Sequence, residues 1–183
     1  YVSLLADRKT RKVLGVEAAG KHGDAVKARV DSIAVLLQHG VDIDEVCSLE
    51  VGYAPPFASA MDVINNAGNA LDNILSGKNR PIDVTDFIRE FKAKSFRVLD
   101  IRGEKEAQSA IDKFGEQWIN IPQGELNSRK SEVPVDEPLV IFCDTGARSY
   151  EAQVVLDAAG ITDTRHVQGG KALVMVTDPK FFE

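Results

Sequence analysis

The arrangement of apolar and polar positions in the first part of the chain predicts a small mixed domain. Within residues 2–20, the pattern predicts two strands joined by a turn from Asp7 to Arg11. Apolar residues then recur at helical spacing, and Gly40 is placed to end that helix. A second predicted helix runs from about Ala58 to Ser76. We therefore expect residues 1–78 to form a small α+β domain.

The second part of the chain is organised around one uninterrupted apolar run. Residues 139–142 (LVIF) are typical of a strand buried in a parallel sheet. This strand delivers Cys143 into a short loop, whose residues are Asp144, Thr145, Gly146 and Ala147. Gly146 tolerates the positive φ angles that turn backbone N–H groups inward, and Ser149 is a suitable N-cap for a following helix. The positive end of that helix, with Arg148 nearby, would favour a nucleophilic thiolate. Cys143 taken alone is also consistent with a buried, unreactive cysteine.

This segment, CDTGARS (143–149), resembles the active loop of the rhodanese family of sulfurtransferases, in which the cysteine carries a persulfide. Other family elements follow in order as the opening helix, the central strand, the next strand and a late double-glycine turn: VTDFIREF (84–91), RVLDIR (97–102), INIP (119–122) and VQGG (167–170). FGEQW (114–118) stands where the family usually has Gly-His-Ile. The resemblance implies a doubly wound parallel-sheet domain over residues 82–183.

The loop favours sulfur chemistry over phosphoryl transfer. Four residues separate Cys143 from Arg148, one fewer than in phosphatases built on cysteine and arginine, and the smaller ring suits a single sulfur atom. We expect Cys143 to attack a sulfane sulfur while loop N–H groups stabilise the persulfide. Arg148 would either orient the anionic donor or pin the loop through an ion pair. Asp144 adds a negative charge that should repel thiosulfate. Asp100 and Arg102 are expected to brace the end of a strand.

The first domain resembles the C-terminal dimerisation domain of pyridine nucleotide-disulfide oxidoreductases, in the branch of coenzyme A disulfide reductases and NADH-dependent persulfide reductases. The matching segments are LGVEAAG (14–20), YAPPF (53–57) and SAMDVINNAGNALDNIL (59–75). The resemblance implies a homodimer in which Tyr53 reaches the partner's flavin and donates a hydrogen bond to a departing thiolate. Alternatively, Tyr53 only begins a rigid turn set by the two prolines that follow Ala54.

The resemblance further implies that the full enzyme uses FAD and NAD(P)H to reduce coenzyme A disulfide, persulfide or polysulfide. No Gly-x-Gly-x-x-Gly turn follows a strand here. Because the chain also begins without methionine, we expect it to be part of a larger protein and to bind neither cofactor alone. The alternative function is a non-catalytic rhodanese-like binding or sensing module attached to a dimerisation domain.

Composition and charge restrict the partners, the location and the metal binding that we expect. A net charge of −6 argues against nucleic acid and anionic membranes as partners. No apolar segment is long enough to span a membrane, and two cysteines make no disulfide framework, so the cytoplasm is the expected location. The three histidines lack metal-ligand spacing, so no metal is expected. The sequence leaves open whether Cys47 partners Cys143 and whether His166 lies at the substrate mouth.

Overall fold

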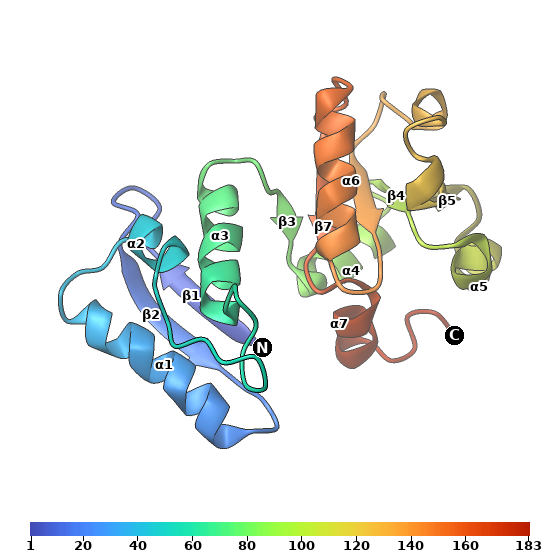
Figure 1. The fold of residues 1–183 in the computed structure, drawn as a ribbon. Helices are drawn as coiled ribbons and strands as arrows, with labels where there is room; N and C mark the ends of the chain where they lie inside the picture. Colours follow the sequence, from blue (N-terminus) through green and yellow to red (C-terminus); the bar gives the residue numbers. More distant parts are fainter. The chain divides into compact units, whose positions relative to one another are not determined.

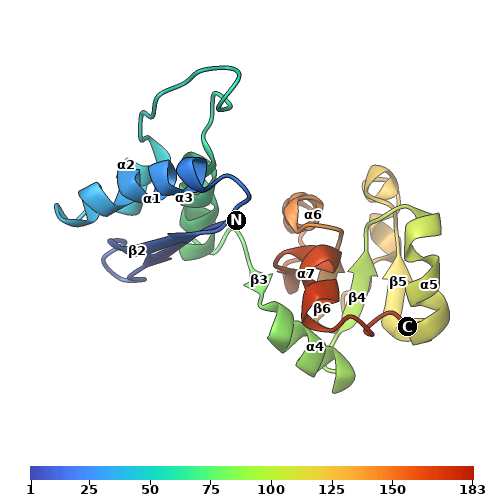
Figure 2. The ribbon, with the colours of Figure 1, turned by 90° about the horizontal axis from the view of Figure 1, so that it is seen from below.

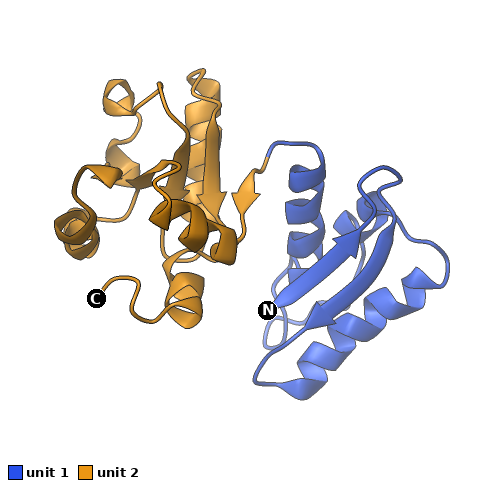
Figure 3. Ribbon diagram, turned by 180° about the vertical axis from the view of Figure 1, so that it is seen from behind, with its two compact units in different colours: residues 1–78 blue, residues 79–183 orange.

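The computed structural model describes all 183 residues and consists of two compact units, residues 1–78 and 79–183 (Figure 3). The boundary falls after Lys78. The short segment 79–81 belongs to the second unit, where Arg80 pairs with Asp157 at 2.6 Å.

The first unit packs three helices against a two-stranded sheet. Its elements are β1 (Val2–Ala6), β2 (Val13–Ala18), α1 (Gly23–Leu37), α2 (Ile43–Cys47) and α3 (Val63–Leu75). The two strands pair antiparallel, α1 contacts β2, and α3 contacts both β1 and α2. The buried residues that form the core of this unit are Val13, Ile33, Val41, Ile43, Val46 and Ile64. The expected α+β organisation of this part is confirmed.

The predicted start of the second helix at Ala58 is wrong, because α3 begins at Val63. Asp62 is its N-cap, and the carboxylate accepts a hydrogen bond from the Ile64 N–H at 3.1 Å. Asn65 completes the capping box by accepting from the Asp62 N–H at 3.2 Å. These hydrogen bonds satisfy backbone groups that would otherwise lack partners, so the helix starts here although the preceding residues are compatible with helix.

The second unit is an open five-stranded parallel sheet with helices on both faces (Figures 1 and 2). Its strands are β3 (Pro81–Ile82), β4 (Arg97–Asp100), β5 (Trp118–Asn120), β6 (Leu139–Phe142) and β7 (Thr164–Val167). Its α-helices are α4 (Val84–Lys92), α5 (Glu104–Phe114), α6 (Ala147–Ala158) and α7 (Gly170–Thr177). Short 3₁₀ turns are η1 (Gly115–Gln117), η2 (Gln123–Glu125) and η3 (Lys130–Glu132). The strand order is β3-β7-β6-β4-β5, and the predicted doubly wound fold is confirmed.

The alternation of side chains along β6 decides which face receives the cysteine. Val140 and Phe142 point to the face covered by α4, α5 and α7. Leu139, Ile141 and Cys143 point to the face covered by α6. Since successive residues of a strand face opposite sides, the register of β6 places the Cys143 sulfur beneath α6.

Asp100 and Arg102 form a buried ion pair, here called the brace, at the end of β4. Arg102 donates from Nη2 to Asp100 Oδ2 at 2.6 Å, and the Trp118 indole N–H donates to the same oxygen at 3.0 Å. Both charged side chains are essentially inaccessible to solvent. The Arg102 guanidinium also lies over the Phe142 ring, 5.1 Å from its centroid. The FGEQW segment therefore contributes an aromatic donor to the brace through Trp118.

We predict that removing one partner of this brace destabilises the second unit strongly. Asp100→Ala leaves the Arg102 charge buried without its carboxylate, so the free energy of unfolding should fall by about 3–5 kcal/mol. Urea denaturation measures the change. Asp136→Ala, which removes an exposed carboxylate, is the matched control and should change stability by less than about 0.5 kcal/mol. Equal effects of the two substitutions would contradict the bracing role.

The Asp62 cap predicts a pH-dependent stability of the first unit. Burial by itself raises the pKa of Asp62, but the hydrogen bonds from Arg29 and from the Ile64 N–H outweigh it and lower the pKa below its ordinary value. The carboxylate therefore stabilises the fold above the unfolded pKa, about 4, and this contribution is lost as the pH falls through the lower folded value.

Asp62→Asn retains an N-cap acceptor but loses the charge that Arg29 contacts. We expect it to lower the free energy of unfolding by about 1–3 kcal/mol at pH 7. Urea denaturation between pH 7 and roughly pH 2 should show this difference shrinking. Asp24→Asn, in the exposed first turn of α1, is the control. A difference between Asp62→Asn and the unsubstituted chain that stays constant with pH would contradict the assignment.

Candidate functional site

Cys143 lies at the carboxyl edge of the sheet, where β6 gives way to a tight loop before α6. Its side chain is fully buried. The Gly146 N–H donates to the Cys143 sulfur at 3.1 Å, and the Ser149 hydroxyl oxygen lies 3.4 Å from it. The sulfur thus faces the N-terminus of a twelve-residue helix, where a negative charge is stabilised. Among the loop N–H groups, Gly146 is the one that reaches the sulfur.

The expectation that Ser149 caps α6 is wrong. The N-cap is Gly146, whose φ of 98° only glycine adopts readily, and α6 begins at Ala147. Ser149 lies inside the first turn, where its hydroxyl donates to the Gly146 carbonyl at 2.9 Å and contacts the sulfur. The helix therefore begins about one turn earlier than a cap at Ser149 would allow, because the chain already turns at Gly146.

The double-glycine turn after β7 holds the loop in place. The Lys171 N–H donates to the Cys143 carbonyl at 2.8 Å, and the Ala172 N–H donates to the Asp144 carbonyl at 2.9 Å. A Cβ atom on Gly170 would lie 2.4 Å from the Cys143 carbonyl oxygen, so no larger residue fits there. The sequence singled out these glycines only by resemblance. That Gly169 and Gly170 are consecutive was the sign in the sequence that two backbones could approach closely here.

The charged residues of the loop are paired with one another. Arg148 donates from Nη2 to Asp144 Oδ2, and Arg102 Nη1 lies 3.9 Å from Asp144 Oδ1. Arg148 therefore forms an ion pair of the kind that would pin the loop, which was one of its two expected roles. Two guanidinium groups offset the Asp144 charge, which weakens the repulsion expected for thiosulfate. Thr145 and Ala147 are exposed on the outside of the loop.

His166 does not lie at a substrate mouth, because only 5% of its surface is exposed. It lies behind the cysteine, with Nδ1 at 3.4 Å from the Ser149 hydroxyl oxygen and Nε2 at 2.5 Å from Asn79 Oδ1. Sequence reasoning missed Asn79 entirely, since it lies far from the loop along the chain. No local pattern marks a residue that joins a site only through folding.

Tyr53 and Cys47 both belong to the first unit. Tyr53 is 59% exposed and lines a pocket of about 400 Å³ with Cys47, Met61 and other residues. Burial raises the pKa of the Cys47 thiol, which makes it less reactive than an ordinary cysteine. Cys47 and Cys143 are both free thiols.

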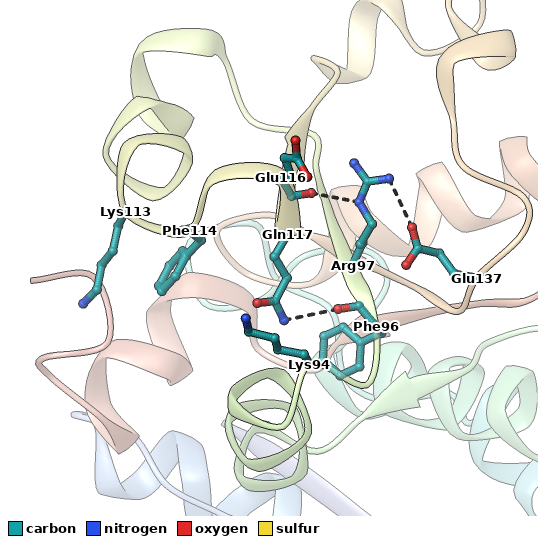
Figure 4. Close-up of a pocket in the computed structure, with 8 residues that line it drawn as sticks. All are labelled: Lys94, Phe96, Arg97, Lys113, Phe114, Glu116, Gln117 and Glu137. Atoms are coloured by element: carbon teal, nitrogen blue, oxygen red, sulfur yellow. Dashed lines mark hydrogen bonds and ion pairs between the residues drawn. The ribbon is translucent and has the colours of Figure 1, made fainter.

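Figure 4 shows a cavity of about 740 Å³ at the amino edge of the sheet. Cys143 follows the carboxyl end of β6, at the opposite edge. The cavity surrounds the start of β4. Its Arg97 donates to the Glu116 carbonyl at 2.8 Å and to Glu137 at 3.1 Å, so this cation is already paired (Figure 4). None of the residues that line this cavity belongs to the Cys143 loop, so the cavity is separate from that loop. No three His, Cys, Asp or Glu side chains are grouped so as to hold a metal ion, and no helix is long and apolar enough to cross a membrane.

No family model matches the chain. A coenzyme A disulfide reductase of Staphylococcus aureus is 36% identical over 68 residues, which are 37% of this chain and 15% of that protein. The crystal structure of reduced Bacillus anthracis CoADR-RHD covers 98% of this chain at 31% identity, with a TM-score of 0.85. The NAD-dependent persulfide reductase from A. fulgidus covers 91% at 30% identity, with a TM-score of 0.73. The chain spans 31% and 28% of the lengths of these two chains. It is homologous to the C-terminal region of coenzyme A disulfide reductases, and its second unit is a rhodanese-like domain.

Proposed function

We propose that this chain is the C-terminal part of a flavin-dependent reductase of coenzyme A disulfide, persulfide or polysulfide, and that its rhodanese-like unit transfers sulfane sulfur through a persulfide on Cys143. The observation that carries the proposal is the Gly146 N–H, 3.1 Å from the Cys143 sulfur at the N-terminus of α6. A donor placed there stabilises negative charge on the sulfur both before attack and in the persulfide.

The loop geometry supports a specific division of work. Cys143 attacks the outer sulfur of the donor, and the thiolate or sulfite behind that sulfur leaves. Arg148 and Arg102 supply positive charge on the loop side of Asp144, where an anionic donor would be oriented. Asp100 holds Arg102 in place through the brace at the end of β4. Thr145 and Ala147, exposed on the loop, would contact the donor.

One observation favours a different function. The Cys143 side chain is fully buried. A loop that kept the sulfur buried would suit a non-catalytic binding or sensing module. Catalysis requires the sulfur to become accessible when a donor arrives, so the two functions differ in whether it does.

The cofactors and assembly of the whole enzyme extend this proposal. One relative is named a coenzyme A disulfide reductase, and one similar structure is named an NAD-dependent persulfide reductase. We propose FAD and NAD(P)H, bound by parts of the enzyme beyond these residues, since the 183 residues contain no dinucleotide-binding glycine turn.

A homodimer through the first unit is supported by its exposed apolar side chains, which are Leu5, Leu14, Val35 and Phe57. In such a dimer the exposed Tyr53 would be free to donate a hydrogen bond to a thiolate leaving group at the partner's flavin. We place the enzyme in the cytoplasm, where its free thiols would stay reduced.

The sulfur-transfer proposal predicts a mass change confined to one residue. After incubation with glutathione persulfide, polysulfide or thiosulfate, peptide mass spectrometry should show Cys143 gaining one sulfur atom, which a thiol acceptor then removes. Cys143→Ser should abolish the gain, and Cys47→Ser should leave it unchanged. If no donor modifies a free Cys143 thiol, the protein is the non-catalytic module instead.

The paired loop charges predict the effect of removing Asp144. In Asp144→Asn, Arg148 loses its carboxylate partner and becomes available to the donor, so transfer from thiosulfate should speed up roughly tenfold, or about 1.4 kcal/mol. Asp163→Asn makes the same charge change before β7, at the opposite edge of the sheet, and should leave the rate unchanged. A slower rate for Asp144→Asn would show that the ion pair is needed to hold the loop.

A further inference from the structure

Four polar side chains form a continuous chain of contacts behind the candidate nucleophile. The Cys143 sulfur lies 3.4 Å from Ser149 Oγ, which lies 3.4 Å from His166 Nδ1. His166 Nε2 lies 2.5 Å from Asn79 Oδ1. The residues come from the end of β6, the first turn of α6, the middle of β7 and the segment before β3. Cys143 and Ser149 are fully buried and His166 nearly so, which shields the chain from water.

The Asn79 side-chain amide determines which ring nitrogen of His166 carries the proton. Asn79 Oδ1 can only accept, so the proton of a neutral His166 ring must be on Nε2. Nδ1 is then left with a lone pair that faces the Ser149 hydroxyl. Burial lowers the pKa of His166 to about 4, and the nearby Arg80 charge acts in the same direction. The ring is therefore neutral near pH 7 and able to accept a proton.

We propose that His166, held by Asn79, accepts the Cys143 proton through the Ser149 hydroxyl when the sulfur attacks. This inference rests on the proposed sulfur transfer. His166 and Asn79 are positioning residues in this scheme, because they act on the sulfur only through Ser149. No local sequence pattern points to the pair, since 87 residues separate them.

The proposed step balances in atoms and charge. The Cys143 sulfur uses an electron pair to bond to the outer sulfur of the donor, and the donor's S–S bond breaks with its pair on the departing thiolate. At rest the Ser149 hydroxyl donates to the Gly146 carbonyl at 2.9 Å, so its hydrogen first rotates toward His166 Nδ1. The Cys143 proton then moves to Ser149 Oγ as the Ser149 proton moves to His166 Nδ1. The imidazolium then returns its proton through the same hydroxyl, and the departing thiolate takes it up on release. Cys143 is left as a persulfide, and no external oxidant or reductant is required.

The groups around His166 shape the expected pH dependence. Arg80, before β3, is paired with Asp157 of α6 at 2.6 and 3.0 Å, which offsets much of its charge. The Tyr150 ring of α6 lies 6.2 Å from the imidazole, and Cys143 approaches from the loop. On β7 itself, Arg165 is paired with Glu90. As Cys143 becomes a thiolate, the one unpaired charge in contact with the chain is negative, and this favours protonation of His166.

The test measures the rate of sulfur uptake from glutathione persulfide by intact-mass spectrometry between pH 6 and pH 10, in the Cys47→Ser background. For His166→Gln we expect uptake to slow by about 10- to 100-fold near pH 6.5. The rate should recover to within a few-fold near pH 10, where an unassisted cysteine thiol ionises by itself. Asn79→Leu and Ser149→Ala should give the same profile. Asn79→Asp, which places a carboxylate on the imidazole, should extend fast uptake to lower pH.

Tyr150→Phe is the matched control, since it changes a neighbour of the ring and leaves the chain of contacts intact; its profile should follow that of the unsubstituted protein. Thermal unfolding identifies any variant that fails to fold, and Asn79→Leu replaces His166→Gln in that case. A loss of rate that is equal at all pH values, or no loss, overturns the proton-acceptor role while sulfur transfer stands. Failure of the unsubstituted protein to take up sulfur overturns the proposed function itself.

Discussion

The candidate site depends on the contact between two backbone turns. The Cys143 loop and the double-glycine turn after β7 approach so closely that a Cβ on Gly170 would lie 2.4 Å from the Cys143 carbonyl oxygen. That approach allows the Lys171 and Ala172 N–H groups to bond the loop carbonyls. It also fixes the loop so that the Gly146 N–H reaches the sulfur. The position of the candidate nucleophile is thus set by backbone packing, and the side chains around it add further contacts.

The charged side chains near Cys143 form a series of ion pairs that begins in the sheet and ends at the loop surface. The buried Asp100 carboxylate holds Arg102, whose Nη1 faces Asp144, and Asp144 in turn holds Arg148. Each link becomes more exposed than the one before it. The inner pair is rigid because an unpaired charge there is costly, whereas the outer pair is screened by water and opens more easily. The outer pair is therefore the easier of the two to break.

The fold shows where sequence patterns were sufficient and where they were not. The apolar run 139–142 predicted a buried parallel strand, and β6 occupies those residues. The start of α3 and the N-cap of α6 were both misplaced, for one reason. Helix starts are decided by which residue satisfies the first free N–H groups, and several nearby residues were chemically suitable. Asp62 and Gly146 were selected by their tertiary surroundings.

By itself, the sequence determined the two-part organisation and the α/β class of the second unit, and it indicated the candidate nucleophile, because each is written in a contiguous segment such as CDTGARS. Tertiary structure alone decided that Asp144 is paired, that Cys143 is buried, and that His166 and Asn79 lie behind it. The contact between His166 and Asn79 joins residues far apart in the chain. It depends on the order of strands in the sheet, which brings β3, β7 and β6 side by side.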